Sequence, residues 1–213
     1  MSVYVFDVNE TLLDMSALDP FFERTFGDAA ARPLWFSQML QLALVATITG
    51  EYRPFGDHAI AALEMLGARR DIPVGDEERA AVRQGMTSLP AHRDVRPALE
   101  RLRGDGARLA TLTNSTLEVA EAQLEFAGIR DLFEASLSAD SVQRLKPAPE
   151  PYRHAAEQLG VPIGEVLLVA AHAWDVAGAM AAGARAAFVA RPGMVPDPRG
   201  EPDLVVTNLA ELT

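Results

Sequence analysis

Several segments of this chain end in polar side chains that could carry out chemistry, each near a short apolar run. In a parallel sheet the ligand crevice lies beyond the carboxyl ends of the strands, so side chains of this kind would meet at one edge. Convergence of several segments is what a binding or catalytic site requires. The candidates are Asp7, Asn9, Glu10, Thr11, Thr113, Asn114, Ser115, Lys146, His172, Trp174 and Asp175.

Asp7 and Lys146 are the pair with the clearest chemical potential. A carboxylate at a strand end, beside backbone N–H groups and a lysine, stays ionised and can attack an electrophile to form a covalent ester. Lys146 is the only lysine in a chain with 19 basic residues. We interpret it as a position that needs a compact ammonium group and not a planar guanidinium.

The elements that must position these residues alternate between strands and helices. Near-continuous apolar runs predict strands covered on both faces at 3–8, 107–113, 166–171, 184–190 and 203–207. Helical patterns lie at 95–104, 115–128, 149–160 and 175–183. A capping box, Ser115-x-x-Glu118, places the start of the second of these helices at 114–115. The alternation predicts an α/β fold with a doubly wound, Rossmann-like parallel sheet.

Residues 15–90 break this alternation. The pattern there is helical throughout, with helices predicted at 17–26, 31–49, 57–68 and 76–87. The simplest account is an all-helical cap inserted after the first strand. We therefore predict a core domain formed by 1–14 and 91–213, and a cap domain formed by 15–90.

The composition excludes several classes of protein. The chain has 213 residues, 49% of them hydrophobic, which is typical of a globular protein with one core. A net charge of -11, with both signs interspersed, argues against a nucleic-acid partner. No apolar run is long enough to span a bilayer and no leader precedes the first strand, so we expect no membrane partner and a cytoplasmic location. The absence of cysteine removes thiol chemistry and cysteine metal sites.

Taken together, the motifs resemble those of the haloacid dehalogenase-like hydrolase superfamily. Its first motif, Asp-x-x-x-Thr after strand one, is matched by Asp7 and Thr11, and its Ser/Thr after strand two by Thr113. Its lysine is matched by Lys146 and its acidic stretch by Asp175. Each motif is weak alone, but their order along the chain is specific. The segments LTNS, KPAPEPY and AAHAWDVAGA are further similar to segments of the L-2-haloacid dehalogenase (type II) branch, whose helical cap the insertion resembles.

The resemblance implies a metal-independent hydrolase that displaces halide from a short 2-haloalkanoate through an ester on Asp7. It implies catalytic roles for Asp7, Thr11, Lys146 and Asp175, with Asp175 as the base or the group that orients the attacking water. No cofactor is implied, the partner is a small carboxylate or other anion, and members of the branch are often homodimers. The side chains expected to bind the substrate or shape its pocket are Asn9, Phe36, Thr113, Asn114, Ser115, Tyr152, His172 and Trp174.

Asn9 bears on the choice between two chemistries. In the superfamily's phosphatases an aspartate at this position protonates the leaving alkoxide, which Asn9 cannot do, whereas a halide leaves as a stable anion. Ala170 stands where phosphatases have an acidic metal ligand, which leaves few ligands for octahedral Mg²⁺. The alternatives are a Mg²⁺-dependent phosphatase of a small phosphorylated metabolite, with Asp7, Asn9 and Asp175 at the metal, and a catalytically idle member that binds a small anion or a protein.

One departure from the branch concerns the positive charge of the site. Where the branch carries a halide-binding arginine on its cap, this chain has Phe36. Two carboxylates of the protein and the carboxylate of the substrate then face Lys146 as the sole cation. A protonated His172 would supply part of the deficit. Arg32 and Arg53 are the cap cations considered as replacements.

Overall fold

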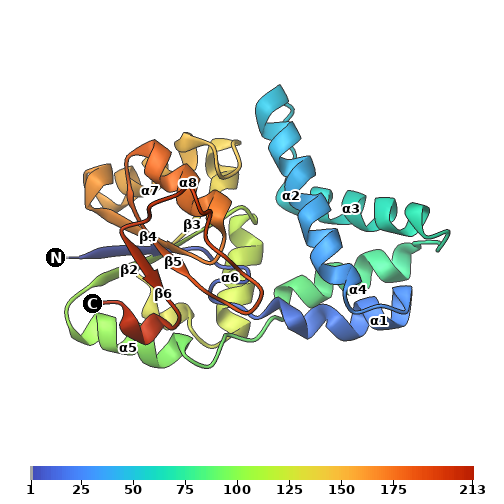
Figure 1. The fold of residues 1–213 in the computed structure, drawn as a ribbon, viewed down its shortest axis with the longest axis horizontal. Helices are drawn as coiled ribbons and strands as arrows, with labels where there is room; N and C mark the ends of the chain where they lie inside the picture. Colours follow the sequence, from blue (N-terminus) through green and yellow to red (C-terminus); the bar gives the residue numbers. More distant parts are fainter. Residues whose placement is uncertain (1) are drawn as a thin grey trace.

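The computed structural model describes residues 2–213, in which a sheet-containing core lies beside a helical lobe (Figure 1). Within these residues, six parallel strands form one sheet in the order β3-β2-β1-β4-β5-β6. The doubly wound parallel sheet predicted from the sequence is thereby confirmed. The strands are β1 (Val3–Phe6), β2 (Arg108–Thr113), β3 (Ala135–Ser138), β4 (Val166–Ala170), β5 (Arg185–Val189) and β6 (Leu204–Val206).

Strand β1 lies in the middle of the sheet, where the order of the strands reverses. Its Phe6 is opposite Thr111 of β2 and Val169 of β4. Successive side chains of a strand point to opposite faces, and so Tyr4 and Phe6 join one hydrophobic cluster while Val3 joins another. The residue after Phe6 therefore leaves the sheet at the topological switch point, where doubly wound sheets bind their ligands.

Helices cover both faces of the sheet. Helices α5 (Val95–Gly104) and α6 (Leu117–Phe126) pack in the cluster that contains Tyr4, whereas α7 (Pro149–Leu159) and α8 (Ala173–Ala182) pack in the other. In Figure 1, α7 and α8 lie above the sheet and α5 lies below it. Short 3-10 helices complete the core and its junction with the lobe: η1 (Met15–Leu18), η2 (Arg130–Leu132), η3 (Ala139–Val142), η4 (Ile163–Glu165) and η5 (Leu209–Glu211).

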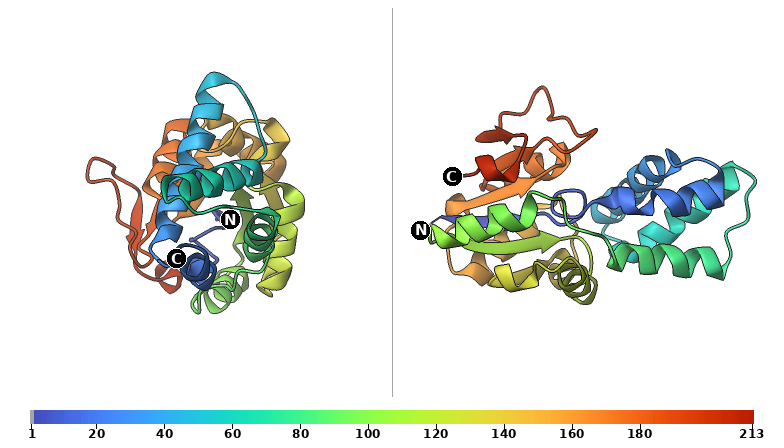
Figure 2. Two further views of the ribbon diagram at one scale, coloured as in Figure 1. Left: turned by 90° about the vertical axis from the view of Figure 1, so that its right-hand side faces the viewer. Right: turned by 90° about the horizontal axis from the view of Figure 1, so that it is seen from below.

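The helical lobe follows β1 and extends from one end of the sheet (Figure 2). Its helices are α1 (Asp19–Phe26), α2 (Ala31–Thr49), α3 (Phe55–Arg69) and α4 (Asp76–Thr87). Trp35 of α2 is fully buried, and its indole N–H donates to the carbonyl of Ala59 in α3 at 2.8 Å. The predicted all-helical cap after the first strand is confirmed, while its division from the core at 14/15 and 90/91 stays a prediction. No helix within residues 2–213 has the length and apolar character needed to cross a membrane.

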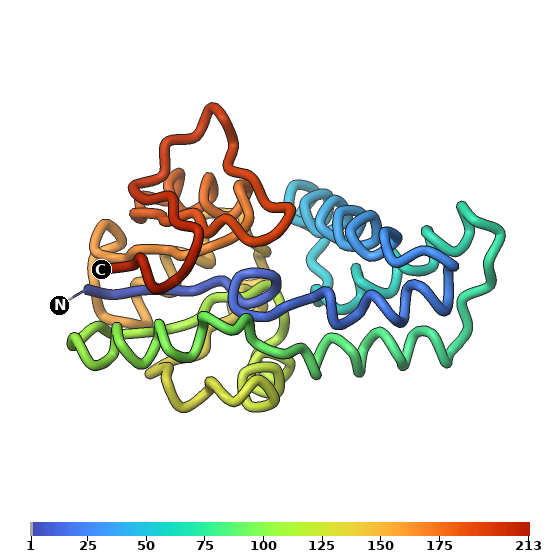
Figure 3. Tube along the Cα trace, turned by 60° about the horizontal axis from the view of Figure 1, so that its bottom comes forward, coloured from blue at the N-terminus to red at the C-terminus, as the bar shows by residue number. Residues whose placement is uncertain are grey.

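Two adjacent chain segments join the lobe to the core (Figure 3). Leu13 forms an antiparallel bridge with Ala91, and the Asp14 N–H donates to the Pro90 carbonyl at 2.8 Å. Buried residues of the lobe and of one face of the core belong to a single hydrophobic cluster. The lobe is therefore packed against the core close to the carboxyl end of β1.

Some local predictions were wrong. Strand β3 was missed because its sequence, ASLS, is short and carries only one large apolar side chain. The helix predicted to begin at 114–115 begins at Leu117, and its N-cap is Thr116, whose Oγ1 accepts a hydrogen bond from the Val119 N–H at 3.5 Å. The capping box at Ser115 is therefore wrong. The helices predicted at 17–26, 57–68 and 175–183 begin instead at Asp19, Phe55 and Ala173.

Candidate active site

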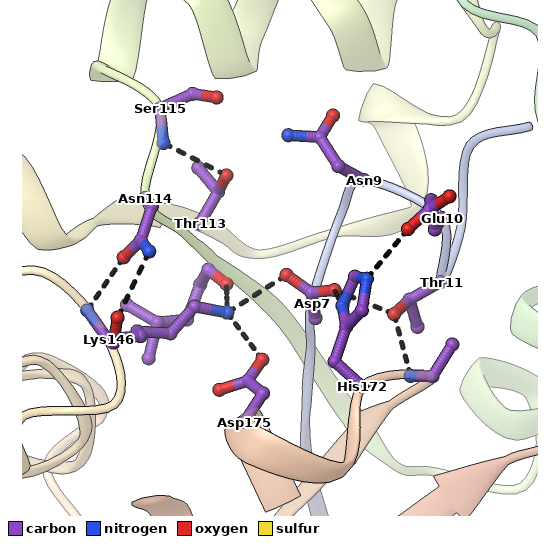
Figure 4. Close-up of polar contacts among 12 residues, drawn as sticks. Asp7, Asn9, Glu10, Thr11, Thr113, Asn114, Ser115, Lys146, His172 and Asp175 are labelled. Atoms are coloured by element: carbon purple, nitrogen blue, oxygen red, sulfur yellow. Dashed lines mark hydrogen bonds and ion pairs between the residues drawn. The ribbon is translucent and has the colours of Figure 1, made fainter. Parts of the chain in front are cut away.

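Lys146 lies between two carboxylates at the carboxyl end of the sheet (Figure 4). Its ammonium group donates to Asp7 Oδ1 at 2.9 Å, to Asp175 Oδ2 at 2.6 Å and to the Leu112 carbonyl at 2.8 Å. The three side chains that carry charge are all buried. The N–H groups of the ammonium are therefore fully engaged inside the protein.

The second oxygen of Asp7 is held from the opposite side. The Thr11 hydroxyl donates to Asp7 Oδ2 at 2.7 Å and itself accepts a hydrogen bond from the Ala171 N–H at 2.9 Å. His172 Nδ1 lies 3.3 Å from the same oxygen, and the Asp7 N–H donates to the Val169 carbonyl at 3.0 Å. The carboxylate is thus oriented by donors from several segments, as a positioned nucleophile requires.

Asn114 and Tyr152 hold the lysine and the second carboxylate in place. Asn114 Oδ1 accepts the Lys146 N–H at 2.7 Å, and its amide N–H donates to the Lys146 carbonyl at 3.2 Å. The Tyr152 hydroxyl donates to Asp175 Oδ1 at 2.5 Å. A Cβ atom on Gly178 would lie 2.7 Å from that hydroxyl, so helix α8 needs glycine there. Asn114 and Tyr152, expected to bind the substrate or shape its pocket, make these contacts within the charged cluster.

Thr113 and Ser115 make local contacts. The Ser115 N–H donates to Thr113 Oγ1 at 3.2 Å, and the Ser115 carbonyl accepts a hydrogen bond from Ser138 Oγ at 2.6 Å. Both residues are buried at the end of β2. Within residues 2–213, no hydrogen bond joins either of them to Asp7. Thr113 is the last residue of β2 and Ser115 follows that strand, and neither side chain enters the charged cluster.

The buried charges set one another's ionisation. Burial alone would raise the pKa of Asp7, but the charge of Lys146 and the hydrogen bond with His172 hold it well below its usual range. Burial would lower the pKa of Lys146, yet Asp175 and Asp7 raise it above its ordinary value. Burial raises the pKa of Asp175, and Lys146 opposes this. At neutral pH Asp7 is therefore a carboxylate beside an ammonium ion, as a nucleophile requires.

His172 lies between two aromatic rings. Its ring centroid is 5.6 Å from that of Phe36, in cap helix α2, and 5.2 Å from that of Trp174, and each pair is stacked with an interplanar angle of 26°. Burial alone would lower the pKa of His172, but its hydrogen bonds with Asp7 and Glu10 raise it to about 9. The cationic form therefore prevails at neutral pH and is stabilised by the faces of the two rings.

Glu10 joins His172 to the cap. Its Oε2 accepts a hydrogen bond from His172 Nε2 at 2.8 Å, and its Oε1 accepts one from Arg32 at 3.1 Å. Its backbone φ is +62°, which is uncommon for a residue other than glycine. The sequence showed Glu10 as a polar neighbour of Asp7 without a role, since its partners come from distant segments. Of the two cap cations considered, Arg32 reaches Glu10, whereas Arg53 is exposed.

Asn9 points towards helix α6. Its Oδ1 accepts a hydrogen bond from Gln123 Nε2 at 3.0 Å, and the same amide nitrogen donates to the Met86 carbonyl at 2.7 Å. Gln123 is fully buried. Sequence reasoning missed it, because a single glutamine on a helix gives no sign that it will face another segment of the chain.

The donor set at this site does not fit Mg²⁺. The Lys146 ammonium lies where a cation bridging Asp7 and Asp175 would have to sit, and Asn9 Oδ1 is engaged by Gln123. Within residues 2–213, no group of three or more His, Cys, Asp or Glu side chains is arranged to hold a metal ion. A magnesium ion that bridged Asp7 and Asp175 would have to displace the ammonium.

A cavity of about 290 Å³ borders the stacked rings, and Glu10, Phe36, His172 and Trp174 are among the residues that line it. The Trp174 indole N–H is buried and has no hydrogen-bond partner in the described part of the chain. The cavity thus combines apolar walls with the hydrogen-bonded pair of His172 and Glu10, which suits a small ligand with both apolar and polar groups.

A doubly wound sheet with a helical cap beside a buried carboxylate–lysine cluster defines a capped α/β protein with a candidate nucleophile. Residues 1–183 match the family described as haloacid dehalogenase-like hydrolase. The chain therefore belongs to this family, as the resemblance of its motifs implied.

Named relatives span nearly the whole chain. It is 29% identical to (S)-2-haloacid dehalogenase 2 of Pseudomonas sp. (strain CBS-3), over 98% of this chain and 92% of the relative. It is 31% identical to (S)-2-haloacid dehalogenase 4A of Burkholderia cepacia, over 91% of this chain and 84% of the relative. The L-2-haloacid dehalogenase of Xanthobacter autotrophicus, solved with chloropropionic acid covalently bound, superposes with a TM-score of 0.92 at 26% identity, covering 100% of this chain and 96% of the other.

Proposed function

We propose that this chain hydrolyses the carbon–halogen bond of a short 2-haloalkanoate through an ester on Asp7, without a metal ion or other cofactor. Relatives named (S)-2-haloacid dehalogenase align over nearly its whole length. A similar structure carries covalently bound chloropropionic acid. The proposed substrate is therefore a small halogenated carboxylate.

Asn9 is the observation that carries this proposal. An alkoxide leaving group needs a proton, and the residue two positions after the nucleophile is an amide whose oxygen already accepts from Gln123. A halide ion leaves without a proton. Position 9 therefore offers no acid for the alkoxide of a phosphate ester, whereas cleavage of a carbon–halogen bond needs none.

In the first step an oxygen of Asp7 attacks C2 of the substrate, and the electron pair of the carbon–halogen bond leaves with the halide. Lys146 and Thr11 keep the carboxylate ionised and oriented, which lowers the entropic part of the barrier. The product of this step is an ester in which Asp7 is neutral.

In the second step water attacks the Asp7 carboxyl carbon and the bond from that carbon to the ester oxygen breaks. One proton of the water ends on the hydroxyl group of the departing 2-hydroxy acid, the other is released to solvent, and the Asp7 carboxylate is restored. The family resemblance assigns the base for this water to Asp175. Asn114 and Tyr152 keep Lys146 and Asp175 in place through both steps.

The anionic substrate needs positive charge near the place that Phe36 occupies. Lys146 already serves two carboxylates. We assign the remaining positive charge to His172, which lines the cavity, and an additional neutral donor to the Trp174 indole N–H. Thr113 and Ser115 are proposed as the strand-end wall of the substrate pocket.

Halide release is the direct test. The purified protein, in buffer with EDTA, is incubated with haloacetate and with each enantiomer of 2-chloropropionate, and free halide is measured over time. We expect release by the wild type, none by Asp7→Asn, and wild-type release by Asp197→Asn, which changes a surface ion pair with the exposed Arg199. Absence of release across a panel of haloacids would refute the proposal. Mg²⁺-stimulated phosphate release would instead support a phosphatase, and anion binding without turnover would support an idle member.

Homodimerisation and a cytoplasmic location stay predictions from the family resemblance and the sequence. Sedimentation velocity at several protein concentrations tests the first, and cell fractionation tests the second.

A further inference from the structure

The orientation of the Asn9 amide is set by a chain of hydrogen bonds that begins at the cap. Gln123 Nε2 donates to the Met86 carbonyl of helix α4 at 2.7 Å and to Asn9 Oδ1 at 3.0 Å. A backbone carbonyl can only accept hydrogen bonds, so the Gln123 atom that faces it must be the amide nitrogen. The second N–H group of that nitrogen requires an acceptor in Asn9. Asn9 therefore turns its amide oxygen towards Gln123 and its amide nitrogen away from it.

Burial makes this orientation strict. Gln123 is fully buried and the side chain of Asn9 is only 5% exposed. Gln123 Oε1 is buried without a partner within residues 2–213, so both hydrogen bonds of this side chain come from its nitrogen. Turning the Gln123 amide over would place an oxygen against the Met86 carbonyl and leave that carbonyl unpaired in the interior. Buried polar groups rarely lack a partner, and so the native orientation is the favoured one.

The two N–H groups of Asn9 Nδ2 face the end of strand β2. Figure 4 shows this nitrogen directed towards the side of the site where Thr113 and Ser115 lie. It has no hydrogen-bond partner within residues 2–213, yet it is not among the polar atoms that are sealed from solvent. Asn9 follows Asp7 by two residues. These N–H groups are therefore open to a ligand that approaches the nucleophile.

The charged groups of the site are already engaged by the protein itself. The Lys146 ammonium donates to three acceptors of the chain, and both nitrogens of His172 face carboxylates. A carboxylate of the substrate beside Asp7 consequently needs N–H donors that are not engaged, and the Asn9 amide offers two. A hydrogen bond from an amide to a carboxylate is stronger than one between neutral groups. An amide oxygen turned to the same place would instead repel the carboxylate.

We propose that Gln123 is a positioning residue for substrate binding, which holds the Asn9 amide so that Nδ2 donates to the carboxylate of the 2-haloalkanoate. This inference rests on the proposed function and adds to it how the carboxylate of the substrate is recognised. Because Gln123 also donates to the Met86 carbonyl, cap helix α4 takes part in setting the polarity of this donor.

Propionate separates recognition of the carboxylate from the reaction, because it carries the carboxylate but no halogen. The ¹⁵N-labelled protein is titrated with propionate, and its side-chain amide signals are followed by NMR. The signals of Asn9 are assigned by their loss in Asn9→Asp. We expect them to shift as propionate binds. A wild type that does not bind propionate, or that binds it without a shift of the Asn9 signals, would overturn the inference.

Gln123→Glu reverses the polarity with almost no change in the size of the side chain. A carboxyl group offers oxygen to Asn9, since its single proton, where present, is taken by the Met86 carbonyl. Asn9 then turns its nitrogen towards α6 and its oxygen towards the substrate. We expect the dissociation constant of propionate to rise about 10- to 100-fold. KM for (S)-2-chloropropionate should rise by a similar factor and kcat should change less, because the lost contact is one made in the ground state.

The control Gln158→Glu makes the same change at an exposed position of α7 and should bind propionate as the wild type does. Gln123→Met distinguishes polarity from packing. It removes both hydrogen bonds but leaves Asn9 free to keep its nitrogen towards the ligand, so it should weaken propionate binding less than Gln123→Glu does. Equal weakening by the two variants, or more weakening by Gln123→Met, would show that polarity is not the cause.

Failure of this inference and failure of the proposed function give different results. An unchanged dissociation constant in Gln123→Glu would overturn the inference even where the wild type releases halide. A wild type that binds propionate with shifted Asn9 signals but releases no halide from any haloacid would refute the proposed function and still support the carboxylate contact. If Gln123→Glu does not fold, the Asn9 signals of the wild type and the binding by Gln123→Met still decide.

Discussion

Replacing Lys146 by methionine should strongly destabilise the protein. The ammonium donates to Asp7, Asp175 and the Leu112 carbonyl at 2.9, 2.6 and 2.8 Å, and the substitution leaves two buried carboxylates facing each other without a cation. Removal of one partner from a buried ion cluster costs about 3–5 kcal/mol. Two lost hydrogen bonds to charged groups, at about 1.5–3 kcal/mol each, lead to the same range.

The stability lost in Lys146→Met should be larger at neutral pH than at acidic pH. In the wild type, Lys146 holds the pKa of Asp7 below its usual range. The ionised Asp7 therefore stabilises the folded chain above the pKa that it has in the unfolded chain, near 3.8. This stabilisation is lost as the pH falls through the pKa of Asp7 in the folded chain. In Lys146→Met the carboxylates take up protons at higher pH than in the unfolded chain. The difference in stability from the wild type should therefore shrink between pH 7 and pH 5.

Urea unfolding followed by tryptophan fluorescence measures this difference. Arg199→Met, which removes an exposed cation paired with Asp197, is the control and should change the free energy of unfolding by less than about 0.5 kcal/mol. The triple variant Asp7→Asn/Lys146→Met/Asp175→Asn should recover much of the loss, because it removes the charges together. A loss below about 1 kcal/mol in Lys146→Met, or a loss that does not change with pH, would refute the reasoning.

Two further predictions concern residues around the site. Gln123→Met removes the donor to Asn9 and to the Met86 carbonyl and should lower the free energy of unfolding by about 1–3 kcal/mol. The control Gln41→Met changes an exposed side chain and should not lower it. Equal effects of the two substitutions in urea unfolding would contradict the argument from burial. Tyr52→Phe removes the hydrogen bond from the cap to Asp140 of the core and should raise KM by at most about fivefold, through a looser cap. Tyr4→Phe, which loses a hydrogen bond to the Thr213 carbonyl, is its control, and an equal rise in KM there would refute a link to the cap.

The convergence of Asp7, Thr11, Lys146 and Asp175 could be predicted from the sequence because it follows from a general rule. Apolar runs that alternate with helices indicate a parallel sheet, and the residues after its strands share one edge. The structure brings these four side chains together, with Lys146 bonded to both carboxylates. Their catalytic roles stay predictions.

The contacts of Glu10 and Gln123 could not be predicted in the same way. His172 and Arg32, which hold Glu10, are 162 and 22 residues away from it in sequence, and Gln123 is 114 residues from Asn9. Such pairings depend on how the cap and α6 pack, which no local pattern encodes. The charge of His172 likewise depends on two carboxylates that only the folded chain places beside it.

Local structure at the end of β2 shows a different limit. Ser115 and Thr116 are both good N-cap residues, and the acidic residue three positions after Ser115 favoured the first. In the structure the Ser115 carbonyl accepts a hydrogen bond from Ser138 of β3, the strand that sequence reasoning missed. The missed edge strand thus helps to explain why α6 begins at Leu117 and not at 114–115.

A single turnover in water enriched in ¹⁸O tests the central claim most directly. The protein is mixed in excess with (S)-2-chloropropionate, and both the peptide that contains Asp7 and the 2-hydroxy acid product are analysed by mass spectrometry. Attack by Asp7 predicts that ¹⁸O enters the Asp7 carboxylate and that the product carries unlabelled oxygen. Label in the product, with none in Asp7, would show direct attack by water on the substrate and would contradict the ester mechanism.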